Sequence, residues 1–271
     1  LLRPMHQEPS GVRIMAYTAI DDPSAHFQAI NFAGNQTART ITFGGNSDLQ
    51  GDLFWCKERN SAVNWHRVLD TSRGANTSSC PVIYSNSSAT EEAHTSGAQI
   101  RVIGTNSVQI GTGQGINTSS NDMSWWVWKA NGGTTSTDTS GDIDGVIQAN
   151  TTAGFSIVTF TSNGSSDQTV PHGLGAAPEV FWVKTINATG SWACYFKAIG
   201  ETNYISLNAT SALSDNVIWG DTAPTSTLLT IDTDSVAGGT PTMIAYCFKE
   251  IQGYSKFGSY TGNGNADGPF V

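Results

Sequence analysis

Charged side chains are scarce in this sequence: Asp, Glu, Lys and Arg make up 13% of its 271 residues, and the formal net charge is −9. This acidic balance offers no basic surface to a phosphate backbone, so we expect no nucleic-acid partner. No stretch approaches the ~18 consecutive apolar residues of a membrane-spanning helix, so we expect no membrane insertion. Aromatic residues reach 10%, and a chain that is poor in charge but rich in aromatics is predicted to fold.

Cysteine is sparse as well, with four residues in the whole chain. These cysteines (Cys56, Cys80, Cys194, Cys247) lack the C-x-x-C spacing of metal sites and have no histidine close by in the sequence. Three of them lie in apolar, strand-like runs, so we predict small buried thiols in preference to disulfides. The sequence also has no P-loop, no H-E-x-x-H and no G-x-S-x-G motif, and we expect no cofactor.

Turn-forming residues recur at short spacing between β-branched and aromatic runs, which predicts an all-β protein. Helical signals are few. The stretch from Ser88 to Glu91 has the pattern of a capping box and predicts one helical turn.

The sequence contains an internal repeat. Five landmarks recur in the same order, 120 to 128 residues apart: Phe32 with Phe160, DLFWCK (52–57) with EVFWVK (179–184), Trp65 with Trp192, Tyr84 with Ser206, and MSWWVWKA (123–130) with MIAYCFKE (243–250). Conserved order and similar spacing indicate a tandem duplication. The residues from Gly253 on, GYSKFGSYTGNGNADGPFV, resemble the start of each unit and predict a further copy.

The repeat predicts tandem antiparallel β-sandwiches of a jelly-roll-like kind, joined by a polar connector. The predicted boundaries are 1–26 for an N-terminal lead-in, 27–130 for the first sandwich, 131–154 for a Gly/Thr-rich connector, 155–252 for the second sandwich, and 253–271 for the start of a third, truncated unit.

The aromatic run at residues 123–130 is the first candidate for a binding site. Strand alternation places Met123, Trp125 and Val127 on one face and the other aromatics on the opposite face. Both faces are apolar, which favours an inner strand whose rings pack in the core. The alternative is a platform of Trp rings that stack on sugars, with Trp125, Trp65 and Trp192 as the candidate glycan-binding residues.

Other candidate sites are weaker. His172 lies in a Gly-rich loop, but the first repeat has no histidine at the equivalent place, so a structural role is favoured. The stretch DTSGDIDG (138–145) has alternating oxygen ligands yet lacks the bidentate Glu of a calcium loop. No closely spaced carboxylate pair of the glycosidase kind is present. We therefore predict no catalytic residue and no metal site.

The longest motifs resemble a known family. The stretches WKANGGTTSTDTSGDI, HGLGAAPEVFWVK and AYCFKEIQGYSKFGSYTGNGNADGPFV resemble a repeated domain of unknown function in virion proteins of marine tailed bacteriophages, of the cyanophage and pelagiphage type. Those proteins are usually described as tail-fibre or structural proteins. The resemblance covers about residues 15–271 and brings no catalytic residues with it.

The resemblance implies a non-enzymatic virion structural protein, such as a tail fibre, spike or capsid-surface appendage. Such a protein assembles in the host bacterial cytoplasm and is exposed on the particle. The expected partners are other virion proteins, further copies of the chain in a homo-oligomer, and host surface glycans. A glycan-binding adhesin is the alternative, and a polysaccharide depolymerase is a more distant one.

Overall fold

The computed structural model describes residues 18–75, 78–95, 97–232 and 239–269. Within these residues the chain forms antiparallel β-sheets and three short 3-10 turns, so the all-β prediction is confirmed. The stretch from Ser88 to Glu91 contains no helical turn, contrary to the capping-box prediction. Among the described residues, no helix is long and apolar enough to cross a bilayer.

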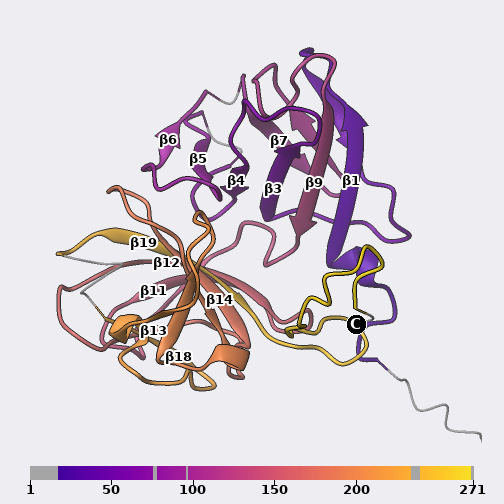
Figure 1. Cartoon of the computed structure of the whole chain (residues 1–271). Coiled ribbons are helices and arrows are strands. Elements are labelled where there is room, and N and C mark those ends of the chain that lie inside the picture. The colour runs from indigo at the N-terminus through magenta and orange to yellow at the C-terminus, as the bar shows by residue number, and fades with distance from the viewer. Residues whose placement is uncertain (1–17, 76–77, 96, 233–238, 270–271) are drawn as a thin grey trace, which may run out of the picture.

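The first half of the chain contains a six-stranded sheet, of order β1-β9-β3-β4-β5-β6, and a three-stranded sheet, of order β2-β8-β7. The bounds of these elements are η1 Pro23–Ala25, β1 Phe27–Ala33, β2 Arg39–Thr42, β3 Leu53–Glu58, β4 Arg67–Asp70, β5 Pro81–Tyr84, β6 Glu92–Ala93, β7 Ile100–Gly104, β8 Ser107–Ile110 and β9 Asp122–Trp128. A core that includes Phe54, Val108 and Trp125 fills the space between the two sheets. This half is therefore a β-sandwich (Figure 1).

The second half contains an eight-stranded sheet, of order β10-β11-β12-β19-β14-β15-β16-β17, and a two-stranded sheet of β13 and β18. The bounds are β10 Ser136–Asp138, β11 Gly145–Asn150, β12 Phe155–Thr161, β13 Gln168–Pro171, β14 Val180–Thr185, β15 Ala193–Phe196, η2 Lys197–Ile199, β16 Asn203–Ser206, β17 Ser214–Asp215, η3 Val217–Trp219, β18 Leu228–Ile231 and β19 Thr242–Phe248. A core that includes Phe181, Trp219 and Leu229 lies between these sheets. The layering agrees with a sandwich, while the jelly-roll connection stays a prediction.

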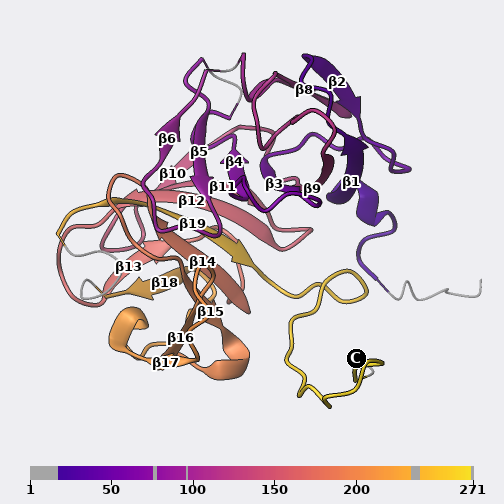
Figure 2. The same cartoon turned by 45° about the horizontal axis from the view of Figure 1, so that its top comes forward.

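The two large sheets pack against each other, so the two sandwiches lie back to back (Figure 2). A third apolar cluster between them includes Leu53 and Val68 from the first half and Trp192 and Tyr246 from the second. The strand β9 explains this layering, because Trp125 enters the first sandwich core while Trp128 packs against the cluster between the sheets. The prediction of an inner strand that is covered on both faces is confirmed.

The two large sheets also share strand order and register. Phe54 lies opposite Val127 and Leu69, and Phe181 lies opposite Cys247 and Tyr195. The backbone N–H groups of the residues after β9 and β19 bond the residues before β1 and β12: Lys129 N to His26 O at 2.9 Å, and Lys249 N to Gly154 O at 2.8 Å. Phe54 and Phe181, and likewise Lys129 and Lys249, thus occupy matching places in the two large sheets. The duplication itself stays an inference, which this shared register supports.

The segment predicted to be a connector belongs to the second sheet. Residues 131–154 include β10 and β11, and β11 pairs with β12 along its length. Composition did not reveal β10, because its residues Ser136, Thr137 and Asp138 are polar and lie at the sheet edge, where polar side chains are tolerated. It did not reveal β11, because the Gly- and Thr-rich residues around this strand are typical of a connector. The described residues after Gly253 form no strand, and Ser255 makes an isolated bridge back to Ile251. The start of a third unit therefore stays a prediction.

Candidate functional site

The three tryptophans predicted to bind glycans lie in different environments. Trp125 is 0% exposed and Trp192 is 1% exposed, whereas Trp65 is 47% exposed. A ring can stack on a sugar only if one of its faces reaches solvent. Trp125 and Trp192 offer no such face, so the structure removes both from the predicted platform and leaves Trp65.

Core packing explains the burial of the other two rings. Trp125 packs edge-on against Phe32 and Phe54, with ring centroids 5.6 and 6.1 Å away. The indole of Trp192 stacks on Tyr246 and donates a hydrogen bond of 2.8 Å to the carbonyl oxygen of Tyr84. Trp192 thus joins the two sandwiches, and alternation along the neighbouring strand β15 could not reveal this because the carbonyl partner lies in the other half.

Trp65 belongs to a surface cluster that we name the Trp65 cluster: Trp65, Arg67, Tyr84, Glu92 and His94. Trp65 precedes β4, which begins at Arg67, and register places Arg67 opposite Tyr84, the last residue of β5. The ring of Trp65 packs edge-on against that of Tyr84 at 4.9 Å. The short strand β6 brings Glu92 to the same edge of the sheet.

The hydroxyl of Tyr84 connects the polar members of this cluster. It accepts a hydrogen bond from Arg67 Nη1 at 3.2 Å and donates one to Glu92 Oε2 at 2.6 Å. His94 Nε2 lies 3.3 Å from the same hydroxyl and 3.3 Å from Glu92 Oε2. The guanidinium carbon of Arg67 lies 5.5 Å from the centroid of the Tyr84 ring, within cation–π range.

The environment fixes the protonation of two groups in the cluster. Burial raises the pKa of Tyr84 to about 12, and its hydrogen bond to Glu92 acts in the same direction. Burial, followed by the charge of Arg67, lowers the pKa of His94, although Glu92 opposes that change. At neutral pH Tyr84 is therefore a phenol and His94 a neutral imidazole, in the same cluster as an exposed indole.

This arrangement suits binding better than hydrolysis. The exposed ring of Trp65 offers an apolar face, and the partly exposed side chains of Glu92 and His94 offer hydrogen-bonding groups, which is the combination that a sugar requires. Glycoside hydrolysis needs two carboxyl groups, and the Trp65 cluster contains one.

A cavity of about 520 Å³ in the second half has both Asp142 and Asp144 in its wall. Hydrogen bonds from Thr169 lower the pKa of Asp142, which is the opposite of what a general acid requires.

Two further candidates have structural partners. His172 is fully buried, its Nδ1 accepts from the backbone N–H of Leu174, and its Nε2 lies 3.2 Å from the carbonyl oxygen of Thr225. Asp138 accepts from the backbone N–H of Ser140. Among the described residues, no group of three or more His, Cys, Asp or Glu side chains is placed to hold a metal ion.

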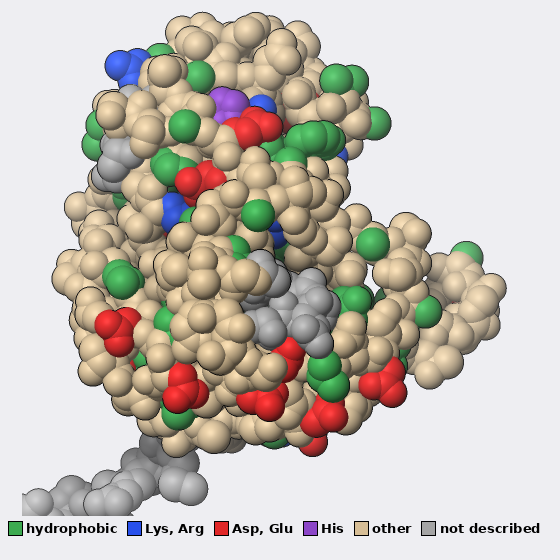
Figure 3. All heavy atoms as spheres, turned by 90° about the vertical axis from the view of Figure 1, so that its left-hand side faces the viewer, with side chains coloured by type: hydrophobic (Ala, Val, Ile, Leu, Met, Phe, Trp, Pro, Cys, Tyr) green, Lys and Arg blue, Asp and Glu red, His purple; other side chains and the backbone are tan. Residues whose placement is uncertain are grey.

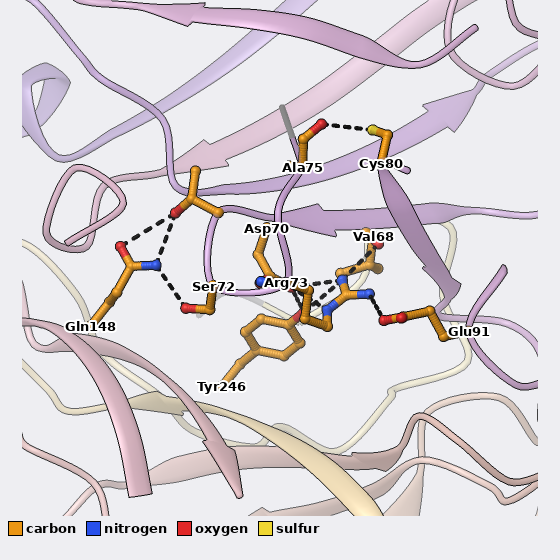
Figure 4. A network of polar contacts seen from close by, with 10 residues as sticks. Val68, Asp70, Ser72, Arg73, Ala75, Cys80, Glu91, Gln148 and Tyr246 are labelled. Atoms are coloured by element: carbon orange, nitrogen blue, oxygen red, sulfur yellow. Dashed lines mark hydrogen bonds and ion pairs between the residues drawn. The ribbon is translucent and has the colours of Figure 1, made fainter. Parts of the chain in front are cut away.

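A buried polar network lies between the sandwiches, and sequence reasoning did not find it (Figure 4). Arg73 Nε donates to Asp70 Oδ2 at 2.7 Å, and Arg73 Nη1 donates to Glu91 Oε2 at 2.8 Å. From the other half, the hydroxyl of Tyr246 donates to Asp70 Oδ2 at 2.6 Å. Burial and the charge of Asp70 raise the pKa of Tyr246. In the sequence, only the three-residue spacing of Asp70 and Arg73 pointed to an ion pair. That spacing could not indicate Tyr246, which lies in the other half.

The surface seen from the left of Figure 1 carries charge in two places. Figure 3 shows a histidine among acidic and basic side chains in its upper part, at the level of β5 and β6, and acidic side chains along its lower part. The upper group lies in the first half, which carries the Trp65 cluster.

A family model described as a domain of unknown function (DUF7483) matches residues 22–271. No curated protein matches the chain. No solved structure matches it either.

Proposed function

Because the chain belongs to the DUF7483 family, whose description assigns no function, we propose from its structure that it is a non-enzymatic structural module of a tailed-phage particle. Its place there is in a tail fibre, spike or capsid-surface appendage. The observation that carries this proposal is the back-to-back packing of two sandwiches whose large sheets share the order of six strands, β1-β9-β3-β4-β5-β6 in the first and β12-β19-β14-β15-β16-β17 in the second. A module that repeats and packs on its neighbour adds length while each copy buries its own core.

The cysteines support the proposal through their chemistry. All four are free and buried. Burial raises the pKa of Cys80 to about 11 and that of Cys194 to about 12, so these thiols stay protonated and unreactive. A protein that assembles in a reducing cytoplasm must fold without disulfides, and this core meets that condition.

Immunogold electron microscopy tests the proposal on particles of the phage that encodes the chain. We expect gold at a defined place on the particle, and peptides of the chain in the mass spectrum of purified virions. Detection in infected-cell lysate but not in purified particles would overturn the proposal. The control is a lysate-derived cytoplasmic protein, which should be absent from the same particles.

Glycan binding at the Trp65 cluster is the second candidate function, and the exposure of Trp65 beside the ring of Tyr84 favours it. A glycan array with the whole chain, followed by Trp65→Ala, tests it. Loss of the indole should weaken binding at least about fivefold, since aromatic contacts contribute ~1 kcal/mol beyond their buried area. The matched control is Tyr260→Ala, which removes an exposed ring from the C-terminal segment. Binding to no glycan, or equal loss in both variants, removes this candidate.

A further inference from the structure

A cavity of about 260 Å³ lies where the two sandwiches meet. Its wall is mostly aromatic: Phe27 and Trp128 come from the first half, and Phe155, Trp182 and Phe248 come from the second. Recesses between packed units, lined by apolar and aromatic side chains, are the usual place of small-molecule sites. The Trp65 cluster contributes no residue to this wall, so the cavity is a separate candidate.

Equivalent residues of the two halves meet beside this cavity. Trp55 and Trp182 are the third residues of β3 and β14, and their ring centroids lie 5.5 Å apart. Trp128 and Phe248 are the last residues of β9 and β19, and their centroids lie 6.3 Å apart. Contact between equivalent residues is what a two-fold interface produces. The halves therefore pack as a two-fold pair, and the cavity lies where Trp128 and Phe248 meet.

The rings of the wall hold one another in place. The centroid of Phe248 lies 5.0 Å from that of Phe155 and 4.9 Å from that of Trp182. In the first half, Phe27 and Trp128 are directly opposed in β1 and β9, with centroids 4.9 Å apart. Because paired strands carry these rings, the cavity is formed before any ligand enters it.

The C-terminal segment completes the wall. Figure 1 shows this yellow segment leaving β19 and reaching the region beside the start of β1, where Tyr254 packs edge-on against His26 at 6.2 Å. The ring of Phe257 lies 6.1 Å from that of Phe248. The backbone N–H of Phe257 donates to Glu250 Oε1 at 2.9 Å, which fixes the position of this ring.

The wall keeps apolar surface accessible. Phe27, Trp128, Trp182 and Phe257 are only partly buried, although each packs against another ring. Covering such surface with an apolar ligand is favourable, and aromatic walls favour a flat ligand that can stack or meet them edge-on. An apolar cavity of ~150 Å³ holds benzene. The larger volume here gives room for two fused rings.

The charge of the wall narrows the ligand further. Of the described residues in the wall, Lys249 alone carries a charge. Tyr254 stays a neutral phenol at neutral pH, because burial raises its pKa to about 12. A cationic ligand would meet a like charge with no carboxylate in the wall to offset it. We propose that the cavity binds a small planar molecule of two fused aromatic rings that carries no positive charge.

Methyl NMR of the whole chain, with isotope-labelled alanine, tests the site with 2-naphthol as the probe. Ala153 lies in the wall and is 5% exposed, so the ring current of bound naphthol should shift its methyl signal. Ala75, which is 0% exposed in the core of the first sandwich, should keep its signal. An unchanged Ala153 signal at millimolar 2-naphthol would overturn the proposal.

Two further probes test the ligand class. Decahydro-2-naphthol has the same carbon skeleton and hydroxyl group, but its saturated rings are puckered. It should bind at least about fivefold more weakly, since it loses the aromatic contacts. A naphthalene that carries an aminomethyl group is a cation at neutral pH and should also bind more weakly than 2-naphthol. Equal or tighter binding of either probe would contradict the proposed class.

A pair of variants in the C-terminal segment tests the wall itself. Phe257→Ala removes one ring of the wall and should weaken 2-naphthol binding at least about fivefold. The matched control is Tyr260→Ala, which removes a 67% exposed ring three residues further on and should leave the affinity unchanged. The Ala75 signal reports whether each variant keeps its fold. Equal affinity in the two folded variants would place the probe outside this cavity and overturn the proposal.

Discussion

At the scale of single residues, the hydroxyl of Tyr246 joins the two sandwiches through its bond of 2.6 Å to Asp70. Tyr246→Phe keeps the ring but removes the donor, and a buried carboxylate that loses a partner costs ~1–3 kcal/mol. We expect the free energy of unfolding in urea to fall by about that amount. Tyr260→Phe is the control, because its ring is 67% exposed and its hydroxyl should contribute less than about 0.5 kcal/mol. Equal effects in the two variants would contradict a special role for Tyr246.

A second residue-scale prediction concerns Lys184, which is 0% exposed and donates to the carbonyl oxygen of Thr185 at 2.8 Å. Burial lowers its pKa from the ordinary value of 10.5 to about 8. Between pH 8 and pH 10.5 the unfolded chain holds a proton that the folded chain has released, so stability rises with pH across that window. The full change is about 3 kcal/mol, from 1.36 kcal/mol for each pKa unit.

Urea unfolding at pH 8, 9 and 10.5 measures this effect as the difference between the native chain and Lys184→Met. The difference removes contributions from other groups that titrate in the same range. Lys197→Met, which removes a charge from an exposed side chain, controls for the change in net charge. A native chain whose stability follows that of Lys184→Met at every pH would show that Lys184 does not titrate in this window.

At the scale of elements, sequence reasoning succeeded where one strand meets apolar neighbours on both faces. Alternation along β9 was enough to predict that Trp125 and Trp128 point to opposite sides, because each side is a core. It failed for β10, whose residues are all polar, and for β11, whose apolar Val146 and Ile147 stand within a stretch rich in Gly and Thr. β11 pairs with β12, and β10 pairs with β11. The sequence of one strand does not show which sheet edge it will pair with.

The candidate site, too, could be predicted from sequence only in part. Exposure of Trp65 and burial of Trp192 could not be told apart from sequence, since both align within the repeat. The difference arises because Trp192 faces the other half, where the carbonyl oxygen of Tyr84 accepts its N–H, while Trp65 lies on the surface. Glu92 and His94 escaped notice because β6, which positions them, is two residues long.

A prediction at the scale of elements concerns the turn between β11 and β12, which requires glycine at residue 154. Gly154 has φ +69°, and a Cβ there would lie 2.5 Å from the carbonyl oxygen of Lys249. Gly175 has the same φ but no atom within 4 Å of its Cβ position. Gly175→Ala should therefore cost ~1 kcal/mol for the left-handed backbone alone, and Gly154→Ala ~1–3 kcal/mol more for the clash. Urea unfolding compares the two, and equal losses would show that the backbone near Lys249 yields without cost.

At the scale of the whole molecule, the apolar cluster between the two large sheets decides whether the sandwiches unfold together. Trp192 packs in this cluster, and Trp219 packs in the core of the second sandwich alone. Both rings are buried, so Ala in place of either should cost ~3–5 kcal/mol. The two substitutions weaken different parts of the molecule. Trp192→Ala weakens the contact between the two sandwiches, and Trp219→Ala weakens the core of the second sandwich.

Scanning calorimetry separates these cases. The native chain should unfold in one transition whose calorimetric and van't Hoff enthalpies agree. In Trp192→Ala the sandwiches should unfold as separate units. The ratio of the calorimetric to the van't Hoff enthalpy should therefore rise above one. Trp219→Ala leaves the cluster between the sheets intact, so the two sandwiches should still unfold together. We expect one transition at a lower melting temperature. If Trp192→Ala also melts in one transition, the sandwiches are joined by contacts other than this cluster, among which the bond between Tyr246 and Asp70 is the first to remove.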